Sequence, residues 1–286
     1  MSPLLRVATP AVLALGVIAV SFGAILIRLT QAPSLVIAAW RMTLATAVLL
    51  PFGWAKGKRL TRRGLGLSFL AGLFLAFHFG LWIESLRHTT VASSVVLVDT
   101  NPIFVGLFSL LLGERPTATL WQGIVLSVLG GVLIGWGDFA LGGEALLGDL
   151  LALLGAIAAS AYLLVGRRVR HHGELIPYVS TAYGVAAALL FLGLGVFPGP
   201  MVPKGVDWLW ISLLALGPQL LGHTSFNWAL RRLPASAVAV VTLGEPVGAA
   251  LWAYLVFGEG IGPVQGVGML LVLAGIARAL SAVRLL

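Results

Sequence analysis

The chain has 286 residues, of which 59% are hydrophobic and only 10% are charged, and its mean hydropathy is +1.03. A soluble domain carries about 25% charged residues, so this composition excludes a soluble globular protein and indicates an integral membrane protein. The net charge of +8 does not indicate a nucleic-acid partner, because the basic residues lie in short loops and form no stripe with interleaved aromatic residues.

Apolar segments follow one another along the chain, separated by charged residues or by Pro and Gly. Each has about the 20 residues that a helix needs to cross a bilayer. The first is followed by Arg28 without a convincing cleavage site, so we interpret it as an uncleaved span and not as a signal peptide. The ten predicted spans are 10–29, 33–53, 64–86, 90–112, 118–137, 147–166, 175–197, 207–230, 234–257 and 262–281. The expected fold class is an all-α integral membrane protein with ten transmembrane helices.

Basic residues are distributed unequally between alternate loops. If the N-terminus lies in the cytoplasm, 14 Lys and Arg residues face the cytoplasm, three face outward, and Arg41 lies inside a span. Cytoplasmic loops of membrane proteins carry such an excess of basic residues. The distribution therefore predicts that both termini are cytoplasmic.

A set of short motifs occurs twice in the same order and at nearly equal spacing. The two sets are Leu86, Pro102, Gly113-Glu114, Gln122-Gly123 and Leu230, Pro246, Gly258-Glu259, Gln265-Gly266. Because each copy holds five predicted helices, an odd number, the second copy enters the membrane in the opposite sense. The sequence thus predicts two inverted five-helix repeats, 1–140 and 141–286, with a substrate site near the midplane where they meet.

Two carboxyl groups lie in the middle of long apolar segments. Asp99 and Asn101 precede Pro102 in the fourth predicted span, and Glu245 precedes Pro246 in the ninth. A charged side chain at this depth costs at least about 2.5 kcal/mol, so it usually faces a bundle interior or a wet cavity. Each proline lacks an N–H and interrupts its helix. Unpaired backbone at membrane depth is tolerated where it is packed in protein or lines a cavity. We interpret the two segments as broken helices around one site, with the prolines as hinges. Packing kinks with satisfied carboxyl groups are the alternative.

Polar and aromatic side chains recur at helical spacing in two further spans. His78 and Trp82 share one face of the third span, and His223 and Asn227 share one face of the eighth. Two histidines facing lipid would be costly, so we expect both to face a shared cavity. The alternative is that they form interhelical hydrogen bonds, which are worth about 0.6 kcal/mol each. The candidate substrate-binding residues are His78, Trp82, Asp99, Asn101, Tyr162, His223, Asn227 and Glu245.

Aromatic residues within the spans indicate the kind of substrate. A cavity with aromatic walls and few polar groups suits an amphipathic organic molecule, whereas a phosphate compound would require several basic residues, and only Arg41 lies within a span. The aromatic residues concerned are Trp40, Trp82, Tyr162, Tyr183, Trp228 and Trp252.

Enzyme chemistry has little support in the sequence. No His-Glu-Xaa-Xaa-His motif, Gly-rich phosphate loop or cysteine is present. We therefore expect no catalytic residues, no metal and no cofactor. Without a Walker motif, transport is expected to be secondary or passive, with proton coupling through Asp99 or Glu245.

In its ten predicted spans and in the repeated order of Pro, Gly-Glu and Gln-Gly, the chain resembles the drug/metabolite transporter superfamily, in particular its EamA-type exporters. The resemblance covers essentially the whole chain and includes Trp40-Arg41 in the second span. It implies a bacterial inner-membrane protein that exports small metabolites by alternating access. Within the superfamily, the chain is most similar to exporters of aromatic and neutral amino acids. The seventh span departs from the pattern, because it has no arginine matching Arg41.

Three functions stay open at this point. The first is export of amino acids, with a monomeric chain, the lipid bilayer and a small-molecule substrate as the expected partners. The second is export of cationic or hydrophobic drugs, in which Asp99 and Glu245 would bind a cation or a proton. The third is an intramembrane enzyme or a scaffold.

Overall fold

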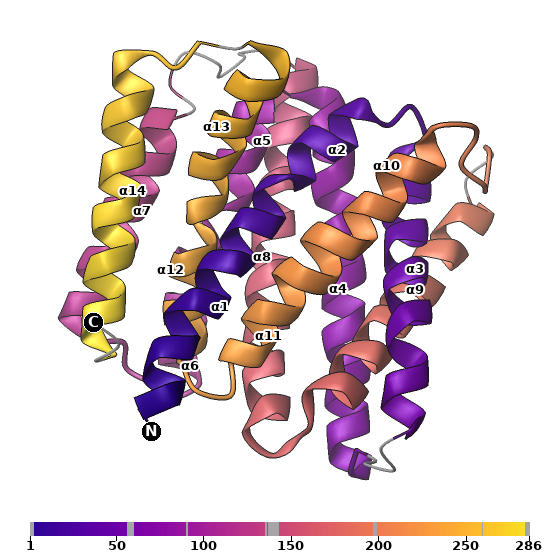
Figure 1. Ribbon diagram of the computed structural model, residues 1–286, viewed down its shortest axis with the longest axis horizontal. Helices are drawn as coiled ribbons and strands as arrows, with labels where there is room; N and C mark the ends of the chain where they lie inside the picture. Colours follow the sequence, from indigo (N-terminus) through magenta and orange to yellow (C-terminus); the bar gives the residue numbers. More distant parts are fainter. Residues whose placement is uncertain are drawn as a thin grey trace.

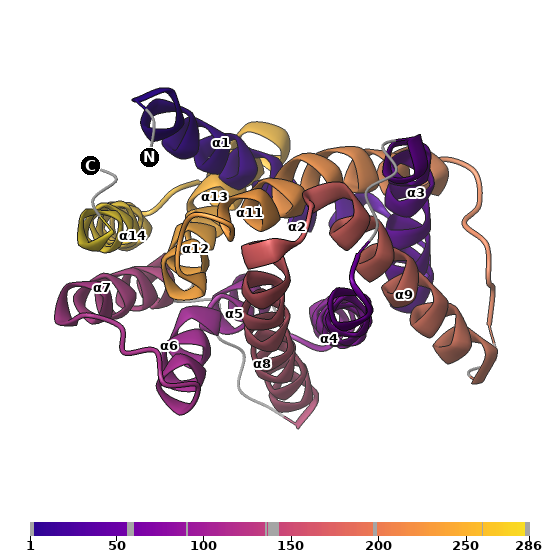
Figure 2. The ribbon, with the colours of Figure 1, turned by 90° about the horizontal axis from the view of Figure 1, so that it is seen from below.

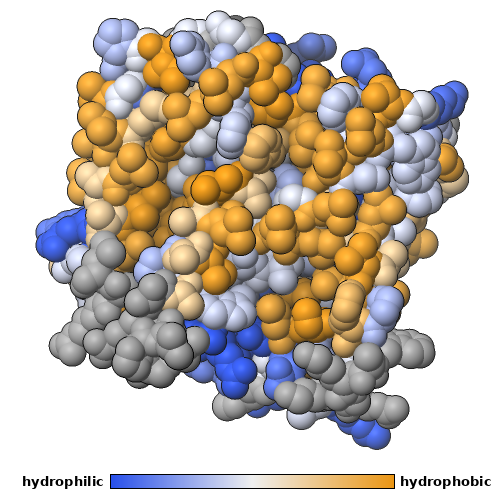
Figure 3. Space-filling model, in the orientation of Figure 1, coloured by the Kyte–Doolittle hydropathy of each residue, from blue (hydrophilic) through white to orange (hydrophobic). Residues whose placement is uncertain are grey.

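A computed structural model describes residues 3–55, 60–89, 91–134, 136, 143–196, 199–258 and 260–283. Within these ranges the regular secondary structure is entirely helical (Figure 1). Apolar residues cover the middle of the face seen in Figure 3, and hydrophilic residues gather toward its upper and lower ends. Such an apolar band matches the hydrocarbon layer of a bilayer.

Six helices run without interruption. They are α3 (Ser34–Ala55), α4 (Arg62–His88), α7 (Ala118–Ile134), α8 (Gly143–His172), α9 (Leu175–Val196) and α14 (Pro263–Ala282).

Four other segments of the described chain are each divided into shorter helices. They are α1 (Pro3–Ser21) with α2 (Gly23–Leu29), α5 (Val91–Val98) with α6 (Asn101–Leu111), α10 (Asp207–Leu214) with the π-helix η1 (Ala215–His223) and α11 (Thr224–Ala229), and α12 (Ala235–Thr242) with α13 (Gly244–Phe257).

Eight of the described segments are long and apolar enough to cross a membrane, and α7 is a shorter apolar helix of 17 residues. The prediction of a multi-pass, all-helical membrane protein is therefore confirmed. The total of ten spans and the inverted repeat stay predictions, since the predicted span 207–230 is divided between α10, η1 and α11. The predicted boundary at 140–141 and Glu259 of the second motif set lie outside the described residues.

Figure 2 shows how the helices pack. Helix α4 lies between α8 and α9, α3 packs on α9, and α7 pairs with α14 at the other side of the molecule. Of the divided segments, α5–α6 and α12–α13 lie between these groups, whereas α1 and the segment from α10 to α11 run along the upper edge of the view. Both chain ends lie on one side in Figure 1, which we call the terminal side, and the connection from α8 to α9 lies there too.

The α7–α14 pair depends on close approach of two backbones. A Cβ atom at Gly130 would lie 2.6 Å from the Gly268 carbonyl oxygen, and one at Gly123 would lie 2.8 Å from the Gly275 carbonyl oxygen. The Ser127 hydroxyl also donates a hydrogen bond of 3.4 Å to the Val272 carbonyl. Small residues of this kind allow membrane helices to gain van der Waals contact where no hydrophobic driving force exists.

Gly130→Ala is expected to destabilise the protein, because the new methyl group overlaps the α14 backbone. Overpacking of this kind costs about 1–3 kcal/mol. Gly131→Ala is the matched control, because a Cβ there meets nothing within 4 Å and alanine is the better helix former by about 0.8–1 kcal/mol. Thermal unfolding in detergent should show a lower midpoint for the first variant only, and equal midpoints would contradict the packing account.

The interruptions predicted from the prolines are present. Helix α5 ends at Val98 and α12 ends at Thr242, each four residues before a proline that cannot donate to its carbonyl. Two further interruptions, at Phe22 and along η1, were not predicted. All four bring irregular backbone into the interior, where membrane proteins accommodate it.

Nearby hydroxyl groups stabilise the interruption between α5 and α6. The Thr100 hydroxyl donates to the Leu97 carbonyl at 2.6 Å. From α8, the Ser160 hydroxyl lies 3.0 Å from the Asn101 carbonyl and 2.7 Å from the Ala156 carbonyl. The broken segment is therefore held by a helix that comes later in the chain.

Candidate substrate-binding site

An internal cavity of about 50 Å³ lies where the divided segments meet the continuous helices. Each interruption contributes residues to it, including Gly23 at the start of α2, Asp99 between α5 and α6, Pro218 in η1, and Thr242 at the end of α12. Helices α3, α4 and α8 complete the wall. The interruptions thus place polar backbone and side chains around a single space.

Seven of the eight residues predicted to bind substrate line this cavity: His78, Trp82, Asp99, Asn101, Tyr162, His223 and Glu245. Asn227 does not. Its side-chain amide donates to the Tyr162 hydroxyl at 2.6 Å and to the His223 carbonyl at 2.8 Å, so it lies behind the wall. The structure therefore places Asn227 as a support for Tyr162.

The two histidines come close together, as their positions on α4 and η1 suggested. Their ring centroids are 6.4 Å apart, and the Phe79 ring lies 4.6 Å from His78 and 5.3 Å from His223. The His78 and Trp82 rings are nearly parallel, with centroids 6.0 Å apart. His78 Nδ1 lies 3.0 Å from the Gly155 carbonyl, and because a carbonyl only accepts, Nδ1 carries the proton. In the neutral ring, Nε2 is then free to accept.

Arg41 is the main site residue missing from the predicted set. It lines the cavity although only 1% of its surface is exposed. Its Nε donates to the Gln219 side-chain oxygen at 3.0 Å, and its guanidinium carbon lies 4.0 Å from the centre of the Phe79 ring. The available signal was that Arg41 is the one Lys or Arg in the middle of a predicted span, but the sequence does not show which way α3 turns it.

Several buried polar atoms around the cavity have no hydrogen-bond partner within the described chain. They are Arg41 Nη1, Trp82 Nε1, Asp99 Oδ2 and Asn101 Oδ1. Leaving a buried donor or acceptor unpaired costs about 1–3 kcal/mol, so unpaired groups in a native structure require an explanation. Two of these atoms donate and two accept, which indicates a ligand that both accepts and donates hydrogen bonds.

The two acidic residues line the same cavity as Arg41. Among the described residues, neither carboxyl group has a Lys, Arg or His nitrogen within 4.0 Å. Glu245 Oε1 and the Trp82 ring lie near Gly23, since a Cβ atom on that glycine would be 3.8 Å from each. The cavity therefore combines one guanidinium group with two carboxyl groups that are free to engage another partner.

Only Trp82 and Tyr162 of the six predicted aromatic residues line the cavity, and Phe226 joins them. The other four lie outside the cavity lining. The indole of Trp40 donates to the Met201 carbonyl at 2.8 Å, and Trp252 stacks on Phe22 with centroids 4.1 Å apart. The remaining two, Trp228 and Tyr183, contact Arg232 and Thr224. Trp40, Trp252 and Tyr183 thus contact residues of other segments, whereas Trp228 contacts a residue four positions further along the chain.

Cysteines introduced into this cysteine-free chain should map the cavity wall. We expect His78→Cys and His223→Cys to react with a small aqueous thiol reagent, because both positions line the cavity. Leu75→Cys and Ala229→Cys are the controls and should stay protected, since both positions are fully buried outside it. Protection at all four positions would show that the two histidines only join helices.

A multi-pass helical membrane protein whose interrupted helices enclose a polar cavity has the architecture of a membrane transporter. The EamA-like transporter family matches residues 9–136 and again residues 146–280. The chain belongs to this family.

Comparisons with known proteins agree. The chain is 26% identical over 267 residues to an uncharacterized transporter of Archaeoglobus fulgidus, covering 90% of this chain and 91% of that protein. It is 28% identical to the pseudopaline exporter CntI of Pseudomonas aeruginosa, covering 79% of each, and 29% identical to the threonine/homoserine exporter RhtA of Escherichia coli, covering 80% and 76%. A solved crystal structure with 21% identity superposes on 98% of each chain with a TM-score of 0.81, which shows a common fold.

Proposed function

We propose that the protein is a secondary exporter of amino acids, including aromatic ones, which pass through the central cavity by alternating access. The proposal includes ten spans arranged as two inverted five-helix repeats, a location in the bacterial inner membrane, and cytoplasmic termini. The two successive family matches support a duplicated architecture. The relatives support export of a small molecule, because two of them are named as exporters.

The observation that carries the substrate class is that Arg41 and two carboxyl groups line one cavity. An amino acid is a zwitterion, so its carboxylate can accept from the unpaired Arg41 Nη1. Its ammonium can donate to Asp99 Oδ2 and Asn101 Oδ1, which are both unpaired acceptors. Charge-assisted hydrogen bonds of this kind are about twice as strong as neutral ones.

The side chain of the substrate would lie against the apolar part of the wall. Trp82, Phe226 and Leu163 offer aromatic and aliphatic surface there. The narrower resemblance to the aromatic and neutral amino-acid exporter YddG supports an aromatic substrate. The name of RhtA supports small polar amino acids as further substrates.

The cavity must enlarge to take such a substrate. Its volume of about 50 Å³ is far below the roughly 300 Å³ of the smallest common ligand sites. Pro102 and Pro246 lie beside the interruptions between α5 and α6 and between α12 and α13, so they are the proposed hinges.

Polar contacts near the two ends of the molecule support alternate opening. Toward the terminal side, Arg170 Nε donates to the Asn227 carbonyl at 3.1 Å, and Arg167 donates to the Leu230 carbonyl. Toward the opposite side, the Gln31 amide donates to Asp207 Oδ1 at 2.9 Å. Release of one set while the other is kept would expose the cavity to one side only.

Transport by the purified protein in proteoliposomes tests the function. We expect uptake of radiolabelled phenylalanine, tryptophan or threonine above that of empty liposomes, and competition by the other neutral amino acids. If a hydrophobic cation is transported and no amino acid is, the result would favour the alternative drug exporter. Two carboxyl groups that have no basic nitrogen within 4.0 Å in the described part of the chain also suit a cation. Because the family and the named relatives are transporters, an enzyme or scaffold is not proposed.

A further inference from the structure

A second, larger hollow lies on the outside of the helix bundle, apart from the central cavity. It has a volume of about 920 Å³ and runs between α3, α4 and α9. Its wall is almost entirely apolar, with Leu73, Phe77, Leu81 and Leu190 among the lining residues. No residue that lines this lateral groove also lines the central cavity.

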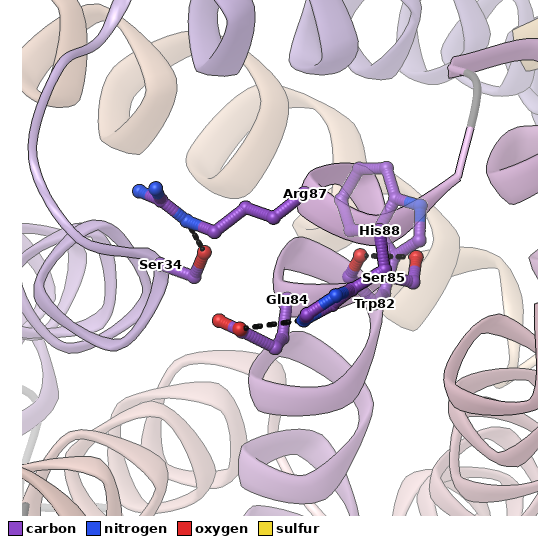
Figure 4. A network of polar contacts seen from close by, with 6 residues as sticks. All are labelled: Ser34, Trp82, Glu84, Ser85, Arg87 and His88. Atoms are coloured by element: carbon purple, nitrogen blue, oxygen red, sulfur yellow. Dashed lines mark hydrogen bonds and ion pairs between the residues drawn. The ribbon is translucent and has the colours of Figure 1, made fainter. Parts of the chain in front are cut away.

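Polar side chains gather at one end of the lateral groove. Ser34 at the start of α3, and Glu84 and Arg87 near the end of α4, line the groove there. Arg87 Nε donates to the Ser34 hydroxyl at 2.5 Å, and Arg87 Nη2 donates to the Ala32 carbonyl at 2.8 Å. In Figure 4 the terminal nitrogens of Arg87 extend beyond Ser34, away from α4. The guanidinium is therefore fixed in place while one edge stays available.

Glu84 places a carboxylate at the same end of the groove as this guanidinium. It contacts His88 Nε2 at 3.2 Å on the same helix, and its side chain remains 41% exposed. In Figure 4 the Glu84 carboxylate lies on the same side of α4 as Ser34. The end of the groove thus presents one cationic and one anionic group next to a long apolar surface.

The length of the lateral groove matches one leaflet of a bilayer. From Leu73 to Glu84 the lining residues follow α4 over a rise of about 17 Å at 1.5 Å per residue. Half of the hydrocarbon core is about 15 Å thick. Glu84 and Arg87 lie near the end of α4 away from the terminal side, so the charged pair lies at headgroup depth when the apolar part spans that leaflet.

We propose that the lateral groove binds a phospholipid with a primary amine in its headgroup, of the phosphatidylethanolamine type. Arg87 holds the phosphate, Glu84 accepts hydrogen bonds from the ammonium, and an acyl chain lies along Phe77 and Leu81. A choline headgroup has no N–H to donate to Glu84. An anionic headgroup without an amine would bring a negative charge against that carboxylate.

The bound lipid would contact α4 on a different face from the one that carries His78 and Trp82. Residues Leu73, Phe77, Leu81 and Glu84 follow a helical stripe, and the central cavity lies on another side of the helix. The proposal depends on the membrane location of the chain but not on the identity of its transported substrate.

Lipid retention by the purified protein tests this proposal. The protein is reconstituted in nanodiscs with equal amounts of phosphatidylethanolamine, phosphatidylcholine and phosphatidylglycerol, extracted into mild detergent, and analysed by native mass spectrometry. We expect at least about tenfold enrichment of phosphatidylethanolamine over phosphatidylcholine, the lower end of what one hydrogen bond to a charged group provides. Equal retention of the two lipids would overturn the proposal.

Variants of the charged pair separate the two headgroup contacts. Glu84→Gln should abolish the preference for phosphatidylethanolamine, and Arg87→Gln should lower retention of every phospholipid. The matched controls are Glu144→Gln and Lys204→Gln, two exposed charged residues outside the groove, which should leave retention unchanged. A preference that persists in Glu84→Gln would overturn the headgroup assignment.

A glycine pair on α9 tests the acyl-chain site without touching any charge. A Cβ atom at Gly193 or at Gly195 meets nothing within 4 Å, so both tolerate leucine, but only Gly193 lines the groove. Gly193→Leu should displace the lipid, whereas Gly195→Leu should retain it. Equal retention by the two leucine variants would show that the groove does not hold the chain.

Discussion

Replacing Arg41 with glutamine is expected to lower amino-acid affinity by about 10- to 150-fold, the equivalent of the 1.5–3 kcal/mol that a hydrogen bond to a charged group contributes. Arg41 Nη1 is buried and has no partner in the described part of the chain, while Nε is held by Gln219 at 3.0 Å. The guanidinium is therefore positioned before the substrate arrives. Competition by unlabelled amino acid against labelled transport measures the change.

A second readout separates loss of recognition from loss of folding. The native protein should prefer a free amino acid over its methyl ester, because the ester has no carboxylate for Arg41 to bind. In Arg41→Gln this preference should disappear, while thermal unfolding shows whether the fold is kept. A folded variant that still discriminates between acid and ester would contradict the role of Arg41.

Glu245→Gln is expected to remove the response of transport to a proton gradient while exchange of substrate across the membrane continues. Glu245 lines the cavity without a basic nitrogen within 4.0 Å among the described residues, and a carboxylate in such a place is costly unless it takes up a proton. Glutamine keeps the shape and fixes the neutral state. With one proton exchanged per substrate, a difference of one pH unit supports about tenfold accumulation.

The gradient response of the native protein and of Glu245→Gln can be compared in the same proteoliposomes. The variant should bring labelled substrate to equal concentrations on both sides and no further. Glu144 is an exposed acidic residue on α8, so Glu144→Gln is the control and should accumulate substrate like the native protein. Equal accumulation by Glu245→Gln and the native protein would remove Glu245 from the coupling mechanism.

The parts of the site that could be predicted are the residues that are unusual in an apolar membrane helix. Asp99 and Glu245 stand out because charge is rare at membrane depth, and Pro102 and Pro246 stand out because they lack an N–H. The predicted place of Asp99 and Glu245 around one space agrees with the cavity lining, which does not include the two prolines, and the roles of all four residues in transport stay predictions.

The parts that could not be predicted depend on tertiary packing. Asn227 shares a helical face with His223, yet it lies behind the wall because its amide reaches the Tyr162 hydroxyl. To predict that Arg41 lines the cavity, one would have to know how α3 is rotated toward Gln219. The π-helix over Ala215–His223 has no local signal beyond Pro218, since a π-turn is stabilised by the surroundings of the helix.

The hydrogen bond that the Ser160 hydroxyl donates to the Asn101 carbonyl has a consequence for the assembly of the protein in the membrane. The segment formed by α5 and α6 carries Asp99 between its two short helices of eight and eleven residues, and a carboxylate within a span lowers the propensity of that span to insert. The helix that supplies Ser160, α8, comes after α7 in the chain and is therefore synthesised later. The Asn101 carbonyl therefore lacks this hydrogen-bond partner until α8 has been synthesised and packed against α6.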